Sequence, residues 1–552
     1  MKVESVRILG ADGKAHPASK PMMLANGSNT PFDAADYQNN NFQDWNPHLW
    51  SPDGERNIYR DRIVSRTRDL TNNDGWASGA ITRIKDNVIG GSFRPVAKPD
   101  YQAISAYTGN KAFDSAWADE FGKACDSYWR NWAADEHFYC HSQRNLNFSQ
   151  MMALAFRHKL VDGDAIAIVR WLPERVGAGR AMYSTCIQIV DPDRLSNPQN
   201  NFDQQTMRGG VEVDEDDVAI AYHIRQAHAG DWFSAEKSLH WERILRETDW
   251  GRPIIVHDFE TERANQHRGG SGVLTPIVNR LKMLAKYDGT ALDAAIVGAM
   301  FGAYVQSPYD PQLVAEALGD TDSVNAYQQS RSEFHQDRKI SLGGARMPIL
   351  FPGENIGTVS ANNPNENYDS FQSAFLRNMA SATGLSAQQM SNNWSDVNYS
   401  SARGALLEAW KTLMPRRTNF ASKFAGPIRS CWLEESMDVD EYPMPRNAPS
   451  FIECRTAFSR CMWMGPGKGV IDVTKEREGS LMAMSMGLST LEIEAADQGL
   501  DWEEMLDQRQ REVEAFKKRG LQLPEWSGIQ NTGREGKGGN HDKNSPNYSP
   551  DS

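Results

Sequence analysis

The sequence predicts an α+β protein made of several units, and three observations lead to this prediction. The chain has 552 residues, which is too long for a single hydrophobic core. Apolar residues recur at helical spacing before residue 160 and again after residue 365. Strand-like runs separated by turns instead fill residues 163–257. Strands and helices are therefore grouped along the chain, as is typical of α+β folds.

The N-terminal region predicts a loose arm followed by helices. Residues 1–40 are polar and rich in Gly, Asn and Pro, so we expect a flexible arm. RDRIVSRTRDL, which starts at Arg60, predicts an amphipathic helix. TNND interrupts it and supplies N-caps for a second helix, GWASGAITRIKDNVI, which ends at Gly90 and Gly91. Further helices are expected at 112–134 and from Phe148 onward.

The middle of the chain predicts a mostly β unit followed by a stalk with a tip. DAIAIVRWLP, STCIQIVDPDRL, GGVEVDEDDVAIAYHIR and RPIIVHDF predict the strands of the β unit. From Leu274 to about Tyr304 the pattern is helical with two apolar flanks, and it is long for a globular helix. Short strands are expected within KISLGGARMPILFPGENIGTVS. A helix on either side of this small insertion would form the stalk.

The C-terminal part predicts helices around one polar loop. In NENYDSFQSAFLRNMASATG the apolar residues fall at helical spacing. The polar loop NNWSDVN follows, and a long helix is expected from about Ser400 to Glu435, with Ser400 or Ser401 as its N-cap. A last helical segment covers about Thr474–Gly520. Residues 527–552 have almost nothing to bury and predict a disordered tail.

Charge and composition exclude some classes of protein. The net charge of −13 argues against a broad basic surface that wraps DNA, but it suits a wall that DNA passes without sticking. The N-terminus lacks the apolar core of a signal peptide, and the longest apolar run, Ala294–Val305, is too short to span a bilayer. We therefore expect no membrane association. The six cysteines are scattered without a CxxC pair, which indicates reduced thiols.

The motifs that resemble catalytic or metal sites are weak. GPGKGVIDVTK lacks the spacing of a phosphate loop, and EHFYCH has no second Cys/His pair at metal-binding distance. The acidic clusters Asp191/Asp193 and Asp214–Asp217 offer carboxylates for Mg²⁺, but both lie where strands end and turn-forming Asp is common. We expect no catalytic residues, no metal and no cofactor. The alternative that these clusters leave open is a Mg²⁺-dependent nuclease or packaging enzyme.

Several passages in a fixed order resemble the lambda family of phage portal proteins. They are RTRDLTNNDGWASGAITRIKDNVIGGSFRP, GGVEVDEDDVAIAYHIR, the run from RGGSGVLTPIVNRLK to GAYV, and GVIDVTKEREGSLMAMSMGLSTLEIEAADQGLDWEEMLDQRQREVEAF. The most specific passage runs from LFPGENIGTVS through FLRNMASATGL to NYSSARGAL. The resemblance covers about Arg60 to Gly520. One departure is GVIDV at Gly469–Val473, where the family is expected to favour Asp-Pro.

The resemblance implies the domains of a portal fold. These are a wing at 41–270, a first stem helix at 271–304, a clip at 305–362, a second stem helix at 363–384, a tunnel loop at 385–399, a long helix and the return part of the wing at 400–469, and a crown at 470–526.

It also implies a function and partners. The expected protein is a ring of about twelve copies at one capsid vertex, through which double-stranded DNA passes without sequence-specific binding. The clip is expected to contact the terminase large subunit and later a head-completion or tail-adaptor protein. The wing is expected to meet major capsid and scaffold proteins. The expected location is the virion, with the host cytoplasm during assembly. A non-viral scaffold adaptor without a channel is the third hypothesis.

Two groups of residues are the expected functional sites. The channel-lining residues are predicted in the polar loop: Gln388, Gln389, Asn392, Asn393, Trp394, Asp396 and Asn398. The salt bridges between subunits are predicted at Arg60, Arg62, Arg66, Arg68 and Arg403, although a solvated helix face explains the first four as well.

Overall fold

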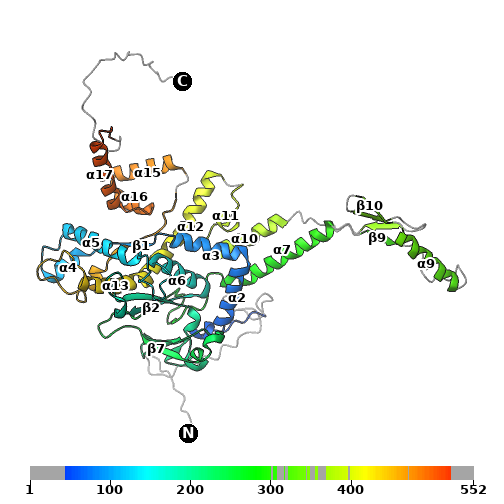
Figure 1. Ribbon diagram of the computed structural model, residues 1–552, viewed down its shortest axis with the longest axis horizontal. Helices are drawn as coiled ribbons and strands as arrows, with labels where there is room; N and C mark the ends of the chain where they lie inside the picture. Colours follow the sequence, from blue (N-terminus) through cyan, green and yellow to red (C-terminus); the bar gives the residue numbers. More distant parts are fainter. Residues whose placement is uncertain are drawn as a thin grey trace, which may run out of the picture.

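The computed structural model describes residues 44–299, 303–306, 316, 321–337, 339–342, 345–348, 355–358, 368–395, 398–469 and 472–523. The expected arm at 1–40, the expected tail at 527–552 and much of the expected clip lie outside these residues. The described chain forms a mixed helical and β body, a long stalk, and a separate group of C-terminal helices (Figure 1).

The helical part of the body is built around one large apolar core. Its main helices are α2 (Arg60–Asn73), α3 (Gly75–Val88), α5 (Ser115–Ala133), α6 (Phe148–Asp162), α12 (Tyr399–Phe420) and α13 (Gly426–Val439), with the short α1 (Pro52–Arg56), α4 (Tyr101–Thr108) and α14 (Arg455–Phe458). The Asp74 side chain caps α3, as the TNND sequence predicts. Trp129 and Trp432 meet edge to face at 5.0 Å in the core, so α5 and α13 are joined through large aromatic surfaces.

Two antiparallel sheets complete the body. In the first, β2 (Asp164–Trp171) lies between β3 (Thr185–Val190) and β8 (Ile255–Phe259), and Ile166 is opposite Val190 on one side and His257 on the other. The second has the order β4 (Met207–Arg208), β5 (Val211–Val213), β6 (Ala219–Arg225), β7 (Trp241–Leu245). Apolar residues of both sheets form a second, smaller core. The predicted mixed β unit is therefore present.

The stalk consists of α7 (Val278–Ala299) with α10 (Tyr368–Thr383) beside it (Figure 1). Tyr287 stacks on Tyr368 with ring centroids 5.7 Å apart, and the Tyr368 hydroxyl donates to Asp288 at 2.8 Å. The tip contains β9 (Ala303–Gln306), α9 (Thr321–Asp337), β10 (Lys339–Leu342), β11 (Ala345–Pro348) and β12 (Asn355–Thr358). β9 and β12 pair antiparallel at the end of α7, and so return the chain toward α10. The stalk with a β-containing tip agrees with the sequence prediction.

The long helix predicted at 400–435 is interrupted in one place. A π-helical turn, Ala421–Ala425, joins α12 to α13, and the helix then continues to Val439. Pro427 lacks the N–H that an α-helix would use, and the Gly426 nitrogen instead bonds the carbonyl of Ala421. Apolar spacing does not indicate this change of hydrogen-bond pattern, because it continues through the turn.

The C-terminal segment predicted as helical forms three helices, α15 (Val473–Ser485), α16 (Leu491–Asp497) and α17 (Trp502–Lys518). Gly487 and Gly499 separate them, both with positive φ, of 71° and 73°. A strand, β13 (Cys461–Met464), precedes them and pairs with β1 (Arg94–Ala97). No residue of α15 or α17 is buried. None of the described helices is long and apolar enough to cross a membrane.

Candidate functional site

The loop between α10 and α12 contains a short helix, α11 (Ala387–Ser391), which is locked at its start. The Ser386 hydroxyl oxygen accepts from the Gln389 nitrogen at 3.1 Å, and the Gln389 side-chain oxygen accepts from the Ser386 nitrogen at 3.0 Å. Leu385 and Met390, on either side of this cap, are both buried in the main core. We did not predict this helix from the sequence, although Ser-x-x-Gln is the signature of a capping box.

The predicted channel-lining residues divide into two kinds. Gln388 and Gln389 are half-buried, and the Gln389 side chain is used in the cap. Asn392, Asn393 and Trp394 are exposed, with 38% of Trp394 accessible. Asp396 lies outside the described residues. Among the described loop residues, Asn392 to Ser395 form a continuous exposed stretch, and Asn398 is exposed as well.

Local hydrogen bonds shape this exposed part. Asn392 ends α11 in the left-handed conformation, with φ 55°, which Asn tolerates better than most residues. The Asn393 side-chain oxygen accepts from the backbone nitrogen and the hydroxyl of Ser395, at 3.0 and 2.6 Å. The backbone nitrogen of Asn393 donates to the Ser391 hydroxyl at 3.2 Å, whereas its side-chain nitrogen and the indole of Trp394 have no such local role in the described part of the chain. They remain available for polar and stacking contacts that carry no sequence information.

Asn398 has a structural role at the start of α12. Its side-chain oxygen accepts from the Ser401 nitrogen at 2.9 Å, so Asn398 is the N-cap. The prediction of Ser400 or Ser401 as the cap is wrong, because both serines already lie inside the helix. Tyr399 follows the cap, and the ammonium of Lys475 lies 5.4 Å from the centre of its ring. The end of the loop therefore contacts the first of the C-terminal helices.

The loop is also attached to α3. A guanidinium nitrogen of Arg83 lies 3.4 Å from the carbonyl oxygen of Met390. Farther along α12, Arg417 donates to the carbonyls of Val88 and Asn87 at 2.8 Å and of Pro466 at 2.7 Å. These contacts join the end of α3, the helix after the loop, and the linker to the C-terminal helices. No sequence motif indicated these contacts, because the arginines bond backbone carbonyl oxygens and not side chains.

Arg60 and Arg68, both predicted at a subunit interface, form ion pairs within their own chain. Arg60 is 2% exposed, and one of its nitrogens lies 3.3 Å from Asp164. Arg68 donates to Asp162, Asp191 and Asp193 at 2.8, 3.0 and 2.6 Å. The other three arginines of the predicted set are exposed, namely Arg62, Arg66 and Arg403.

Asp164 is the centre of this ion-pair cluster. It is fully buried and accepts from Arg268 at 3.2 Å, while His257 Nε2 lies 3.0 Å from its other oxygen. Burial opposes ionisation of Asp164, but the hydrogen bond with His257 and the charges of Arg268 and Arg60 outweigh burial and hold its pKa below the usual range. The cluster fastens α2 to the first sheet.

The acidic clusters do not form a metal centre. Arg68 occupies the carboxylates of Asp191 and Asp193, and Asp191 also accepts from the Asp193 nitrogen at 3.0 Å. Asp214 closes a turn by accepting from the Val218 nitrogen at 2.8 Å. Within the described ranges, no group of three or more His, Cys, Asp or Glu side chains is placed to bind a metal ion.

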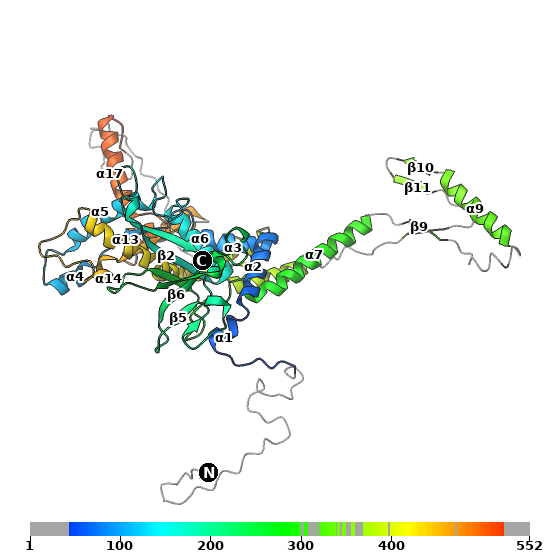
Figure 2. The same cartoon turned by 60° about the horizontal axis from the view of Figure 1, so that its bottom comes forward.

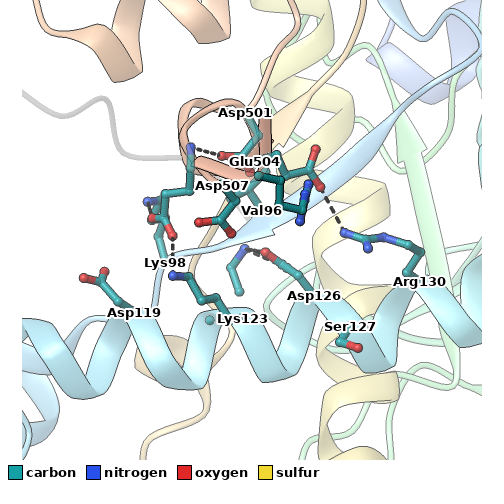
Figure 3. Close-up of a pocket in the computed structure, with 14 residues that line it drawn as sticks. Val96, Lys98, Asp119, Lys123, Asp126, Ser127, Arg130, Asp501, Glu504 and Asp507 are labelled. Atoms are coloured by element: carbon teal, nitrogen blue, oxygen red, sulfur yellow. Dashed lines mark hydrogen bonds and ion pairs between the residues drawn. The ribbon is translucent and has the colours of Figure 1, made fainter. Parts of the chain in front are cut away.

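A cavity lined mainly by charged residues lies where α17 meets α5 and β1 (Figure 3). It has a volume of about 460 Å³. Glu504 bonds both Arg94, at 2.7 Å, and Arg130, at 3.0 Å, while Glu503 receives Lys98 at 3.3 Å. Burial raises the pKa of Asp126 in its wall to about 6. Because α17 has no buried residues, ion pairs provide much of its attachment to the body.

Comparisons with known proteins agree with one another. Residues 38–417 match the model of the phage portal protein family of lambda type. The chain is 30% identical over 492 residues to a portal protein of Escherichia phage N15, and 29% identical over 490 residues to portal protein B of Escherichia phage lambda. Each alignment covers 88% of this chain and 89% of the relative.

Solved structures with a detectable likeness include chains from gene transfer agent particles. A chain from the virion of a native particle gives a TM-score of 0.37 at 13% identity, covering 75% of this chain and 97% of that chain. A chain from the neck of a native particle, computed with C12 symmetry, gives a TM-score of 0.38 at 12% identity, covering 77% and 99%.

Proposed function

Because this chain belongs to the lambda family of phage portal proteins, a structural and non-enzymatic class, we propose that its copies form a closed ring around a channel for double-stranded DNA. The ring, of about twelve copies, would occupy one vertex of the capsid. The protein would be part of the virion, after assembly in the host cytoplasm. DNA would pass through the ring during packaging and again during ejection.

We propose the following division of the chain. Residues 41–270 and 400–469 form the wing, 271–304 and 363–384 the stem helices, 305–362 the clip, 385–399 the tunnel loop and 470–526 the crown. The stalk supports this division, since α7 and α10 leave the body side by side and the β strands lie at its far end (Figure 1). The separate C-terminal helices support the assignment of the crown.

The observation that supports the channel assignment best is the construction of the loop between α10 and α12. A capping box and two buried apolar residues fix its start, Asn398 fixes its end, and Asn392, Asn393 and Trp394 are exposed between them. Such a loop presents amide groups and one aromatic ring at a fixed position. Neutral amides bond phosphate oxygens weakly and without regard to base sequence. Together with a net charge of −13, they would border moving DNA without holding it.

We propose separate partners for the two ends of the molecule. The clip would contact the terminase large subunit during packaging and a head-completion or tail-adaptor protein afterwards. The wing would contact the major capsid protein and the scaffold. Of the predicted interface arginines, Arg62, Arg66 and Arg403 support a role between subunits better than the other two, because their side chains are exposed.

The nuclease alternative loses its support at the acidic clusters. Arg68 holds Asp191 and Asp193 in ion pairs, and the family is non-enzymatic. The scaffold-adaptor alternative does not fit membership of a portal family.

Deletion of Gln388–Val397 tests the role of the loop. We expect the variant to assemble into rings but to package less DNA, or to lose DNA after packaging. Deletion of Gly177–Arg180, an exposed turn in the β unit, is the matched control and should package normally. Normal packaging and retention by the loop deletion would refute the assignment of the loop to the channel.

A further inference from the structure

Arg225, at the end of β6, is a buried cation without an anionic partner. The residue is 7% exposed, and among the described residues its side chain contacts Asn200 and Trp241 but forms no ion pair with a carboxylate. One guanidinium nitrogen bonds the side-chain oxygen of Asn200, the group lies 4.6 Å from the centre of the Trp241 ring, and Nε has no hydrogen-bond partner. Burial lowers the pKa of Arg225, and the charge of Asp61 offsets this only in part. A buried charge in this condition is costly unless another group supplies the counter-charge.

Arg225 lines a cavity of about 930 Å³ between α2 and the β unit. The other charged residues of its wall already have partners. Arg60 and Arg68 meet the aspartates described above, Asp203 accepts from Asn57 at 2.7 Å, and Arg268 donates to three backbone carbonyls as well as to Asp164. Asp61 lies 3.5 Å from Arg60 and is 97% exposed; its charge acts on Arg225, but the two residues form no ion pair. Among the described residues, the cavity therefore supplies no carboxylate in direct contact with the Arg225 guanidinium.

The rim of the cavity indicates that the missing group comes from a protein. Phe202 and Ile58 line the cavity with 86% and 62% of their surface exposed. Ala229 also lines the cavity, and Trp232 and Phe233, which follow it closely in the sequence, are almost fully exposed. Large exposed apolar side chains around a pocket are typical of protein–protein contacts.

The same chain carries the complementary charge at the other end of β6. The turn Asp214–Asp217 joins β5 to β6, and Arg225 is six residues beyond the first residue of the strand. At about 3.3 Å per residue, the two ends of β6 are about 20 Å apart. Asp214 and Asp217 take part in hydrogen bonds, whereas Glu215 and Asp216 are exposed and form no ion pair within the described part of the chain. β5 and β6 lie on the side of the body that carries α1 (Figure 2).

We infer that, in the ring, Glu215 or Asp216 of one copy enters the cavity of the next copy and pairs with Arg225. This inference rests on the proposed ring. When two different surfaces of identical chains contact each other, the same contact repeats from copy to copy around an axis. The copies form a closed ring if the rotation between neighbours allows it. The exposed aromatic residues at the rim would be covered by the same contact. The site is complete only when a second copy is present.

Charge reversal tests the pair. In Arg225→Glu, and in the double variant Glu215→Arg/Asp216→Arg, we expect rings to need a protein concentration roughly thirtyfold higher or more, as measured by mass photometry. The chain that carries all three changes should recover assembly, because the charges are exchanged and not removed. Arg180→Glu, on an exposed turn of the β unit, is the matched control and should assemble as the native chain does. The acidic-turn variant changes only exposed side chains, so it stays informative even if Arg225→Glu fails to fold.

Disulfide trapping identifies the occupant. A chain with Asn201→Cys and Asp216→Cys should form a ladder of covalent oligomers on oxidation, and either single variant should not. If residues 1–43 of the same chain fill the cavity instead, their deletion should mimic Arg225→Glu while the acidic-turn variant has no effect, and the inference is wrong. Rings that are indifferent to every charge reversal would also overturn it while leaving the ring itself intact. A native chain that never forms rings would overturn the proposed function as well.

Discussion

Ser386 and Gln389 bond each other twice, through nitrogen-to-oxygen distances of 3.0 and 3.1 Å, and so fix the start of the loop assigned to the channel. Gln389→Ala removes one of these bonds and leaves the Ser386 nitrogen unpaired. We expect a local loss of about 1 kcal/mol, seen as faster hydrogen exchange over Ala387–Ser391. Gln388→Ala is the control, since the Gln388 side chain has no part in the cap. Equal exchange in the two variants would contradict a fixed loop.

Asp126 should make the body less stable as pH rises. Burial raises its pKa to about 6, above the value of about 3.9 in an unfolded chain. The folded state therefore binds this proton more tightly, and the contribution of Asp126 to stability falls as pH increases from about 4 to about 6. Asp126→Asn should raise the free energy of unfolding by about 2 kcal/mol at pH 7.5, with no gain at pH 4. Denaturant melts at both pH values measure this, with exposed Asp119→Asn as the control. A gain that does not depend on pH would refute the assignment.

The contribution of Asp164 to stability depends on pH in the opposite direction to that of Asp126. Its pKa is lowered in the folded state, so its contribution is present above about pH 4 and is lost as pH falls below the unfolded value. Asp164→Asn leaves Arg268 and Arg60 buried without their shared anion, and we expect a loss of about 3–5 kcal/mol at pH 7. Asp61→Asn should change little, because Asp61 is 97% exposed. Thermal melts of both variants provide the comparison.

Replacing Arg417 should destabilise the protein more than replacing its neighbour Arg416. Arg417 donates to three backbone carbonyls, whereas Arg416 donates to one, that of Thr383 at 3.0 Å. Arg417→Met should cost about 3 kcal/mol or more and should speed hydrogen exchange at Gly465–Lys468, where the linker to the C-terminal helices loses its bond. Arg416→Met should leave exchange in that linker unchanged. Faster exchange there in both variants would show that the linker does not depend on Arg417 specifically.

The sequence predicted those elements whose signals are local. Apolar spacing predicted α3, α5, α7 and α10 well, and alternation with turns predicted the β unit. Asp74 followed the rule for N-caps. The polar loop was also located correctly between two helices, because Asn, Ser and Asp gather there.

Features that depend on distant partners could not be predicted. A helix with arginines on one side has the same sequence pattern whether those arginines face solvent or bond distant aspartates. Arg68 and Arg60 bond aspartates 94 and 133 positions away along the chain. The N-cap role of Asn398 shows only in the backbone geometry at the start of α12. The π-helical turn and the unpaired Arg225 likewise emerge only from the packed structure.

Electron cryomicroscopy of the purified full chain tests the ring most directly. We predict closed rings in which the loops that carry Asn392, Asn393 and Trp394 lie nearest the axis and the stalks point to one end. Single copies at every protein and salt concentration, or rings with these loops on the outer surface, would contradict it.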